Sequence, residues 1–161
     1  MSIRRSVAEV LLWTAIVSAS VVFGASVYQR ISLIPNWGGD LPNSVITYFR
    51  GTTEAHYIGL FWGSVLPVTG ILITLSLIFN WPEKSRRLWI GISLILFLAM
   101  LVWTEVYFIP RGVMPLMVRG GEGMTGDEII LTARAWIFWD WFRMAGTLGF
   151  LLGLLRGLTL R

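Results

Sequence analysis

The chain has 161 residues, of which 55% are hydrophobic, and its mean hydropathy is +0.71. This composition excludes an ordinary soluble globular protein and indicates a chain built for a lipid bilayer. The absence of cysteine excludes disulfides, thiol redox relays and iron–sulfur clusters. The net charge of +4 is explained by basic residues beside membrane segments. The sequence shows no basic face with stacking aromatic residues, so it does not predict nucleic-acid binding.

Four stretches have the length that a membrane-crossing helix needs, which is about 20 apolar residues. They cover residues 7–28, 57–80, 88–109 and 135–155. The first is too long for the apolar region of a cleaved signal, so we interpret it as a permanent helix. The sequence therefore predicts an all-α integral membrane four-helix bundle, formed as a single domain by residues 1–161.

The basic residues predict the orientation of these spans, because cytoplasmic loops carry the excess of lysine and arginine. The short, basic side holds Arg4, Arg5, Lys84, Arg86, Arg87, Arg156 and Arg161. The longer loops, 29–56 and 110–134, hold Arg30, Arg50, Arg111, Arg119 and Arg134 together with most of the acidic residues. We expect both termini in the cytoplasm of a multi-pass protein of the cell (inner or plasma) membrane.

The first long loop contains DLPNSVITYFRG, where Asp40 is a candidate N-cap, Pro42 belongs in a first turn and Gly51 is a stop signal. These residues predict a short helix on the outer surface, either an ordinary interfacial helix or a lid over the bundle. In the second span, Pro67 predicts a bend. The following segment, NWPEKSRR, predicts a tight turn between antiparallel helices.

The second long loop contains RGGEGMTGDE, which we interpret as a flexible connector, since it lacks the lysine of phosphate-binding loops. Thr125 and Glu128 form a capping-box pattern, so the last helix should begin near Gly126 and end at about Leu155. Near its end, glycines recur every four residues, which predicts close helix contact. These are Gly149, Gly153 and Gly157.

The segment RAWIFWDWFR places charges inside the last span. At about 1.5 Å per residue, Asp140 lies about 9 Å and Arg143 about 13 Å inward from Arg134, and Glu105 lies about 9 Å inward from Arg111. A charge at such depth costs roughly 2.5 to 3.5 kcal/mol, and such residues usually face the bundle interior and pair. We therefore predict Glu105, Asp140 and Arg143 as catalytic residues of a buried polar pocket.

Two interpretations of these charges remain open. In the structural one, Glu105 and Arg143 form an interhelical ion pair, and the tryptophans belong to the interfacial belt. In the functional one, the charges and neighbouring aromatic residues form a pocket that opens to the outer leaflet, so that a small hydrophobic ligand enters laterally. The residues predicted to bind that ligand are Trp103, Tyr107, Trp136, Trp139, His56, Trp62, Tyr28 and Asn36.

His56 is the only histidine, and with Glu105 and Asp140 it has the ligand types for a metal site. We disfavour this site because His56 should lie nearer the surface than the two carboxylates and no ligand-spacing motif supports it. The sequence therefore predicts neither a metal nor another cofactor.

Three motifs together resemble the anthrone oxygenase-like family of small four-span membrane proteins. They are VYQRISLIPNW after the first span, WTEVYFIP at the end of the third, and W-x-x-W-x-x-x-R within WIFWDWFR. The resemblance covers nearly the whole chain in span order and loop length. It implies a compact four-helix membrane bundle and oxidation of an anthrone-like polycyclic phenol by O2 without metal or flavin. It further implies Glu105 or Asp140 as base, Arg143 as anion stabiliser and tryptophans as stacking walls.

The leading hypothesis is a membrane-embedded oxygenase- or oxidoreductase-like enzyme for a hydrophobic aromatic, quinone or isoprenoid compound. The alternative is a non-catalytic binding or assembly subunit that holds a lipid, packs against a partner membrane subunit or forms a homo-oligomer. A transport pathway is disfavoured because Thr147 is the only polar residue between Arg143 and the inner arginines on the last helix, and Glu9 should snorkel to the surface.

Overall fold

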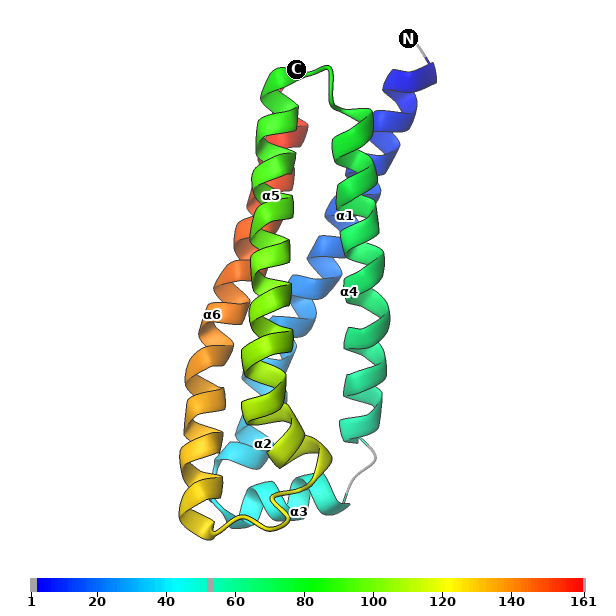
Figure 1. The fold of residues 1–161 in the computed structure, drawn as a ribbon. Helices are drawn as coiled ribbons and strands as arrows, with labels where there is room; N and C mark the ends of the chain where they lie inside the picture. Colours follow the sequence, from blue (N-terminus) through cyan, green and yellow to red (C-terminus); the bar gives the residue numbers. More distant parts are fainter. Residues whose placement is uncertain (1–2, 52–53, 161) are drawn as a thin grey trace. The chain divides into compact units, whose positions relative to one another are not determined.

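The computed structural model describes residues 3–51 and 54–160, apart from the side chains of residues 51 and 54–56. This part of the chain is helical with no strand, so the all-α prediction is confirmed (Figure 1). Two segments, η1 and η2, are π-helical. In chain order the elements are α1 (Ile3–Tyr28), η1 (Gln29–Leu33), α2 (Ile34–Gly38), α3 (Asn43–Gly51), α4 (Glu54–Phe79), α5 (Lys84–Trp103), η2 (Thr104–Val118) and α6 (Gly126–Thr159).

Three helical stretches are long and apolar enough to cross a membrane. They are Ile3–Gly38, Tyr57–Phe79 and Lys84–Val118. Large apolar side chains on them are exposed, among them Val17, Ile71 and Ile95 at more than half of their area. These helices indicate a lipid bilayer as the surroundings of the protein. The apolar part of α6 is interrupted by charged residues and is not one of these stretches.

The chain divides into two compact units. Unit 1 consists of Met1–Ala25, Gly63–Met100 and Ala145–Arg161, and unit 2 of Ser26–Trp62 and Leu101–Met144. Helices α1, α4, α5 and α6 each contribute a segment to both units, whereas η1, α2, α3 and η2 belong to unit 2. Each unit is described by itself below.

Unit 1 is built from regular α-helices with close contacts at small residues. Within its core, the rings of Phe97 and Phe150 meet edge to face with centroids 5.6 Å apart. The hydroxyls of Ser18 and Thr69 join α1 to α4 at 2.7 Å. The predicted contact along the glycine stripe of α6 is confirmed, because a Cβ added at Gly153 would overlap the Ser93 hydroxyl of α5.

Unit 2 contains much more helix than the sequence predicts. The expected outer loop 29–56 forms η1, α2, α3 and the start of α4, and the third helix continues through η2 to Val118 instead of ending at Ile109. Our expectation of irregular loops was therefore wrong for residues 29–38 and 110–118. Pro110 and Pro115, which favour a helix end, lie inside η2. The wider π-helical backbone, with its i→i+5 hydrogen bonds, accommodates prolines that would clash in an α-helix.

The predicted short helix of the first loop is confirmed as α3. Within unit 2 it contacts η2, and Arg50 of α3 donates a hydrogen bond from Nε to the carbonyl of Gly120, at 3.0 Å. The turn that contains Gly120 was expected to be a flexible connector. Its glycines have φ of +58° at Gly120 and +71° at Gly121, values that favour glycine, and its flexibility stays a prediction.

The predicted start of α6 is confirmed at Gly126, and its end at Thr159 lies beyond the expected Leu155. The capping box is formed as predicted. Glu128 accepts hydrogen bonds from the backbone N–H and the hydroxyl of Thr125, at 2.7 and 3.0 Å, and its own N–H donates to the Thr125 hydroxyl. These bonds lower the pKa of the Glu128 carboxyl below its ordinary value.

Candidate functional site

Unit 2 has an aromatic core around Trp136 of α6, whose side chain is buried. The Trp136 ring stacks on Phe49 of α3 with an interplanar angle of 10° and meets Phe108 of η2 edge to face. Trp37 of α2 lies against it as well, with ring centroids 5.0 Å apart. One tryptophan thus joins α2, α3 and η2 to α6, which explains why this interfacial-looking residue is only 4% exposed.

Asp140 and Arg143 form a buried ion pair one helical turn from Trp136. Arg143 donates two hydrogen bonds to the same oxygen of Asp140, Oδ1, from Nη2 at 2.6 Å and from Nε at 3.1 Å. The two residues are 1% and 7% exposed. The guanidinium also lies 4.8 Å from the ring centroid of Trp62 and 5.7 Å from that of Phe108. The opposite charges of the pair therefore compensate each other within α6, and the Arg143 guanidinium lies against two aromatic rings.

The structure does not place Glu105 in this cluster. Its side chain is exposed, and in the described part of the chain it forms no ion pair, so the predicted interior position and the Glu105–Arg143 bridge are both wrong. The buried residues of η2 recur every four positions, at Thr104, Phe108 and Gly112. Glu105 follows Thr104 directly and so points away from that face. The estimate of depth along the helix stays a prediction, and depth alone does not determine the direction of a side chain.

A groove of about 260 Å³ lies between η2 and α6 in unit 2. Four of its nine lining residues are aromatic, and the only charged one is Arg111, whose guanidinium carbon lies 4.4 Å from the ring centroid of Tyr107. Tyr107 in turn meets Trp139 edge to face at 5.7 Å. The lining residues are Tyr107, Phe108, Arg111, Gly112, Leu131, Thr132, Ala135, Trp136 and Trp139.

The groove brings together three of the predicted ligand-binding residues, Tyr107, Trp136 and Trp139. Trp103 lies behind them, stacked on Tyr107 with an interplanar angle of 24°. Trp62 is instead a neighbour of Arg143.

Two other predicted ligand-binding residues do not join the groove, and a third cannot be placed. Tyr28 and Asn36 are exposed and do not line it, and the side chain of His56 lies outside the described residues. Asp140 and Arg143 do not line the groove either. The single pocket expected from the sequence is therefore a groove with a buried ion pair beside it, and Phe108 contacts both.

Two arginines matter here that were not predicted as site residues. Arg111 lines the groove, and its position four residues after Tyr107 was a signal for contact across one helical turn. Arg30 of η1 donates from Nη1 to the backbone carbonyl of Ile137 in α6, at 2.8 Å, and its guanidinium lies 4.4 Å from the ring centroid of Trp141. No sequence signal predicts this second contact.

Buried polar atoms without a hydrogen-bond partner are concentrated in unit 2. Five such side-chain atoms occur in the described part of the chain, and four belong to this unit. Buried polar groups are normally hydrogen-bonded, so each exception marks an atom that a ligand or water could reach. The four atoms are Gln29 Oε1, Thr104 Oγ1, Trp136 Nε1 and Asp140 Oδ2.

The described residues contain no group of three histidine, cysteine, aspartate or glutamate side chains that could hold a metal ion. The side chain of His56 is outside them, so the combination with Glu105 and Asp140 stays a hypothesis. The exposed position of Glu105 and the buried position of Asp140 count against it.

The arrangement in unit 2 favours a flat apolar guest that carries an electron-rich oxygen. Aromatic rings offer stacking surfaces, and the Arg111 cation at the groove is suited to a phenolate or carbonyl oxygen. No family model, curated protein or solved structure matches the chain. The resemblance to the anthrone oxygenase-like family stays a prediction.

Proposed function

We propose that the protein is an oxygenase-like membrane enzyme whose unit 2 binds a hydrophobic polycyclic phenol or quinone-type compound in the groove between η2 and α6. The observation that carries this proposal is the combination of aromatic walls with one cation, Arg111, in a groove of about 260 Å³. That volume is slightly below the usual range for pockets of drug-sized ligands, so a few fused rings would fill the groove. A flat ring system matches the walls better than an isoprenoid chain does.

The proposed reaction needs no carboxylate in contact with the substrate. Arg111 favours the phenolate form of a bound phenol, because a neighbouring cation lowers the pKa of an acid. The phenolate is electron-rich and reacts with O2 at the activated ring CH2 carbon. One oxygen atom becomes the carbonyl of the product, and the other leaves as water with the two hydrogens of that carbon. The phenolic proton is released to water at the open side of the groove and returns after oxidation.

The Asp140–Arg143 pair takes a positioning role in this proposal. Arg143 touches Phe108, and Phe108 lines the groove, so the pair fixes one wall without touching the substrate. Neither Glu105 nor Asp140 lines the groove, and the base role that the resemblance implies is therefore not carried over to them.

A charge-matched pair of variants tests the proposal in lipid nanodiscs. Arg111→Gln removes the groove cation, whereas Arg119→Gln removes an exposed arginine that follows η2 and does not line the groove. With 1,8-dihydroxyanthrone as the probe, we expect oxygen uptake and anthraquinone formation by the native protein, roughly a hundredfold slower turnover for Arg111→Gln, and unchanged turnover for Arg119→Gln. The pH profile of Arg111→Gln should shift to higher pH. Equal losses in both variants, or no turnover by the native protein, would remove the enzyme proposal.

A non-catalytic binding or assembly subunit is the second candidate. One observation favours it, namely that no carboxylate is among the residues lining the groove. It predicts that the same probe binds to the native protein, with weaker binding to Arg111→Gln, while oxygen uptake stays at the level of empty nanodiscs. Binding and turnover are measured on the same samples, so the two candidates are distinguished directly.

We further propose that α6 is a fourth membrane span and that both termini are cytoplasmic, in the inner or plasma membrane. At about 1.5 Å per residue, the 34 residues of α6 reach about 51 Å, more than the hydrocarbon core requires. Its two interior charges are paired with each other at 2.6 Å, which reduces the cost of inserting them.

Because the chain has no cysteine, single cysteines report its topology without interference. Ser6→Cys and Thr159→Cys should react with a membrane-impermeant maleimide only after the cells are opened. Glu122→Cys, between η2 and α6, should react in cells whose inner membrane is exposed but intact. Labelling of Ser6→Cys and Thr159→Cys on opposite sides would show an odd number of spans and contradict the proposed topology.

A further inference from the structure

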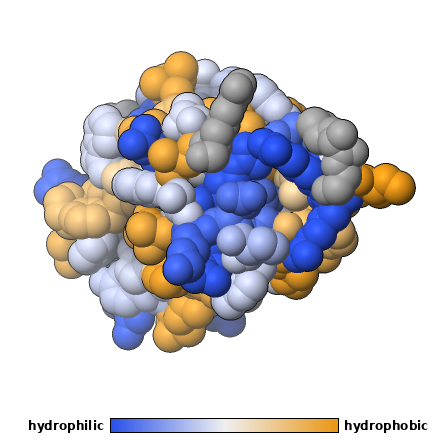
Figure 2. Space-filling view, turned by 90° about the horizontal axis from the view of Figure 1, so that it is seen from above, coloured by the Kyte–Doolittle hydropathy of each residue, from blue (hydrophilic) through white to orange (hydrophobic). Residues whose placement is uncertain are grey.

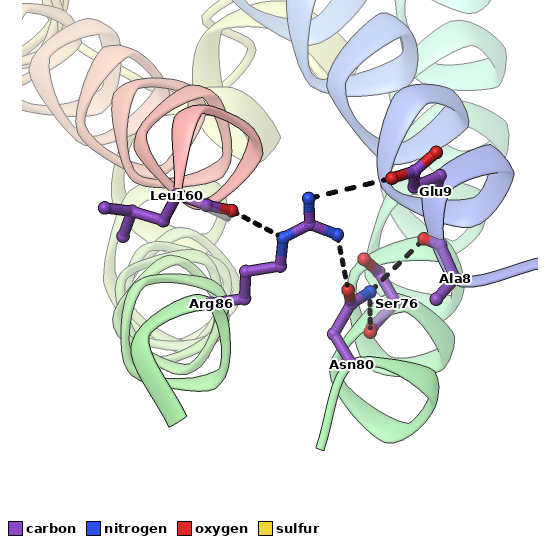
Figure 3. Close-up of polar contacts among 6 residues, drawn as sticks. All are labelled: Ala8, Glu9, Ser76, Asn80, Arg86 and Leu160. Carbon is purple, nitrogen blue, oxygen red and sulfur yellow. Dashed lines mark hydrogen bonds and ion pairs between the residues drawn. The ribbon is translucent and has the colours of Figure 1, made fainter. Parts of the chain in front are cut away.

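Within unit 1, Arg86 of α5 joins the start of α1, the end of α4 and the C-terminal end of the chain (Figure 3). Its Nε donates to the carbonyl of Leu160 at 2.7 Å, and it is only 7% exposed. Its other two nitrogens have longer contacts, 3.4 Å to Asn80 Oδ1 and 3.8 Å to Glu9 Oε1. A guanidinium has five N–H donors, so Arg86 keeps hydrogen-bonding capacity on the side of these long contacts.

Asn80 fixes the geometry around Arg86. Its Nδ2 donates to the backbone carbonyls of Ala8 and Ser76, at 3.2 and 2.9 Å, which turns its Oδ1 toward the guanidinium (Figure 3). Asn80 is 1% exposed. The buried arginine is therefore held in place by a built framework and does not depend on mobile surface side chains.

A cavity of about 300 Å³ opens beside this framework. It lies between the first turns of α1 and the turn from α4 to α5, and hydrophilic residues gather on the end of the molecule that Figure 2 shows. Apolar residues are visible around them, as expected where a membrane protein meets the headgroup layer. The lining residues are Arg4, Arg5, Ala8, Phe79, Asn80, Pro82, Glu83 and Arg86.

The cavity carries an excess of positive charge. Three arginines line it, against Glu83 in the lining and Glu9 beside Arg86. Among the described residues, Arg4 and Arg5 form no ion pair. Like charges that converge on one cavity repel each other, and an anion bound between them relieves this repulsion. The planar guanidinium suits the geometry of phosphate oxygens especially well.

We propose that this cavity binds the phosphate of an anionic phospholipid headgroup. The phosphate would lie between Arg86 and the pair Arg4 and Arg5, and the acyl chains would follow the apolar surface of unit 1. Basic pockets at membrane ends of helices are suited to anionic headgroups. The site belongs to unit 1, does not involve the groove of unit 2, and holds whether or not the protein is an enzyme.

Native mass spectrometry of the full-length protein tests this proposal, with vesicles of phosphatidylcholine alone or mixed with phosphatidylglycerol as the lipid source. We expect phosphatidylglycerol to be retained in preference to phosphatidylcholine. Arg4→Gln and Arg5→Gln should each weaken this retention roughly fivefold, since one arginine near an anionic headgroup contributes about that much. The matched control is Arg156→Gln, which removes an exposed arginine of unit 1 that does not line the cavity.

Inorganic phosphate identifies the source of the ligand. If it does not reduce lipid retention at millimolar concentration, the site takes the headgroup as proposed. If it binds in place of lipid and Arg4→Gln weakens it, the phosphate chemistry stands but its lipid source is overturned. Equal retention of the two lipids, or an equal loss in Arg156→Gln, would overturn the whole proposal. Arg4→Gln, Arg5→Gln and Arg156→Gln all change exposed residues, and their circular dichroism should match that of the native protein.

Discussion

The two units of the molecule differ in how their buried polar groups are hydrogen-bonded. In unit 1, Arg86 and Asn80 bond to backbone carbonyls and to each other. Among the described residues of this unit, Ser76 Oγ is the only buried polar side-chain atom without a hydrogen-bond partner. Unit 2 contains both π-helical segments, a self-neutralised ion pair and four unpartnered atoms. Regular α-helices whose buried polar groups are hydrogen-bonded are typical of a scaffold. Helices of the π type and buried polar atoms without a hydrogen-bond partner are typical of functional sites.

This difference indicates which substitutions should affect stability alone and which should also affect ligand binding. Unit 1 packs small residues closely, so its variants should report on stability and, at the arginine-lined cavity, on lipid retention. Unit 2 places its aromatic side chains around a groove and keeps its ions buried nearby. Variants there should show different effects on the free energy of unfolding and on ligand binding in the groove.

The largest effect is expected from breaking the ion pair of unit 2. Arg143→Met leaves the Asp140 carboxylate buried without its partner, and this should lower the free energy of unfolding by about 3 to 5 kcal/mol, measured by denaturant titration in detergent micelles. The double variant Asp140→Leu with Arg143→Met removes both charges and should recover most of that loss. If the single variant is as stable as the native protein, the pair does not hold unit 2 together.

The double variant also tests whether the ion pair of unit 2 contacts the ligand or only positions Phe108. If the pair only holds Phe108 in place, a stable double variant should still bind the aromatic probe. A modest loss of affinity is expected, because the substituted methionine side chain fills the space beside that ring only partly. A complete loss of binding at native stability would instead make Asp140 or Arg143 a direct ligand contact.

A smaller effect is expected in unit 1 from Gly153→Ala. The added Cβ would overlap the Ser93 hydroxyl and lie 3.3 Å from the carbonyl of Trp89, so the helices must separate slightly. Overpacking of this kind costs about 1 to 3 kcal/mol. Gly91→Ala is the matched control, since nothing lies within 4 Å of its Cβ, and it should be neutral or stabilising. Thermal unfolding of the two variants under identical conditions measures the difference, and equal midpoints would contradict close α5–α6 packing.

The smallest effect is expected at the start of α6. Thr125→Ala removes the cap and should reduce amide protection in the first turn of α6 by about 1 kcal/mol, measured by hydrogen exchange. Because Glu128 has a lowered pKa, its contribution is present above its ordinary pKa of 4.5 and is lost as the pH falls through the lower folded value. Protection factors should therefore fall at acidic pH in the native protein but not in Glu128→Gln. Glu122→Gln, outside the cap, should keep the native pH dependence.

The sequence allowed most of the helices to be predicted but not the structure that connects them. Hydropathy located the apolar parts of α1, α4 and α5, and the capping box located the start of α6. The predicted third span ended at Ile109, whereas the helix continues through Pro110 and Pro115 in η2, which local rules for proline do not anticipate. A π-helical backbone depends on tertiary packing, and no periodicity of a single chain reveals it.

The candidate site was predicted in part for a similar reason. A run of tryptophans at helical spacing indicated Trp136 and Trp139, and both line the groove, while their binding of a ligand stays a prediction. The partner of Arg143 was sought on another helix, although Asp140 is three residues away on the same one. Arg111 was assigned to a loop, and its role follows only from the continuation of the helix beyond Pro110.

The hydrogen bond from Arg30 to the Ile137 carbonyl has a spectroscopic consequence. A carbonyl inside a helix already accepts from the amide four residues later, so a second, charged donor polarises its C=O bond and lowers its stretching frequency. Isotope-edited infrared spectra with carbon-13 and oxygen-18 at Ile137 should therefore show an amide I band at lower wavenumber than the same label at Leu148. In Arg30→Met the Ile137 band should return to the position of an ordinary helical carbonyl.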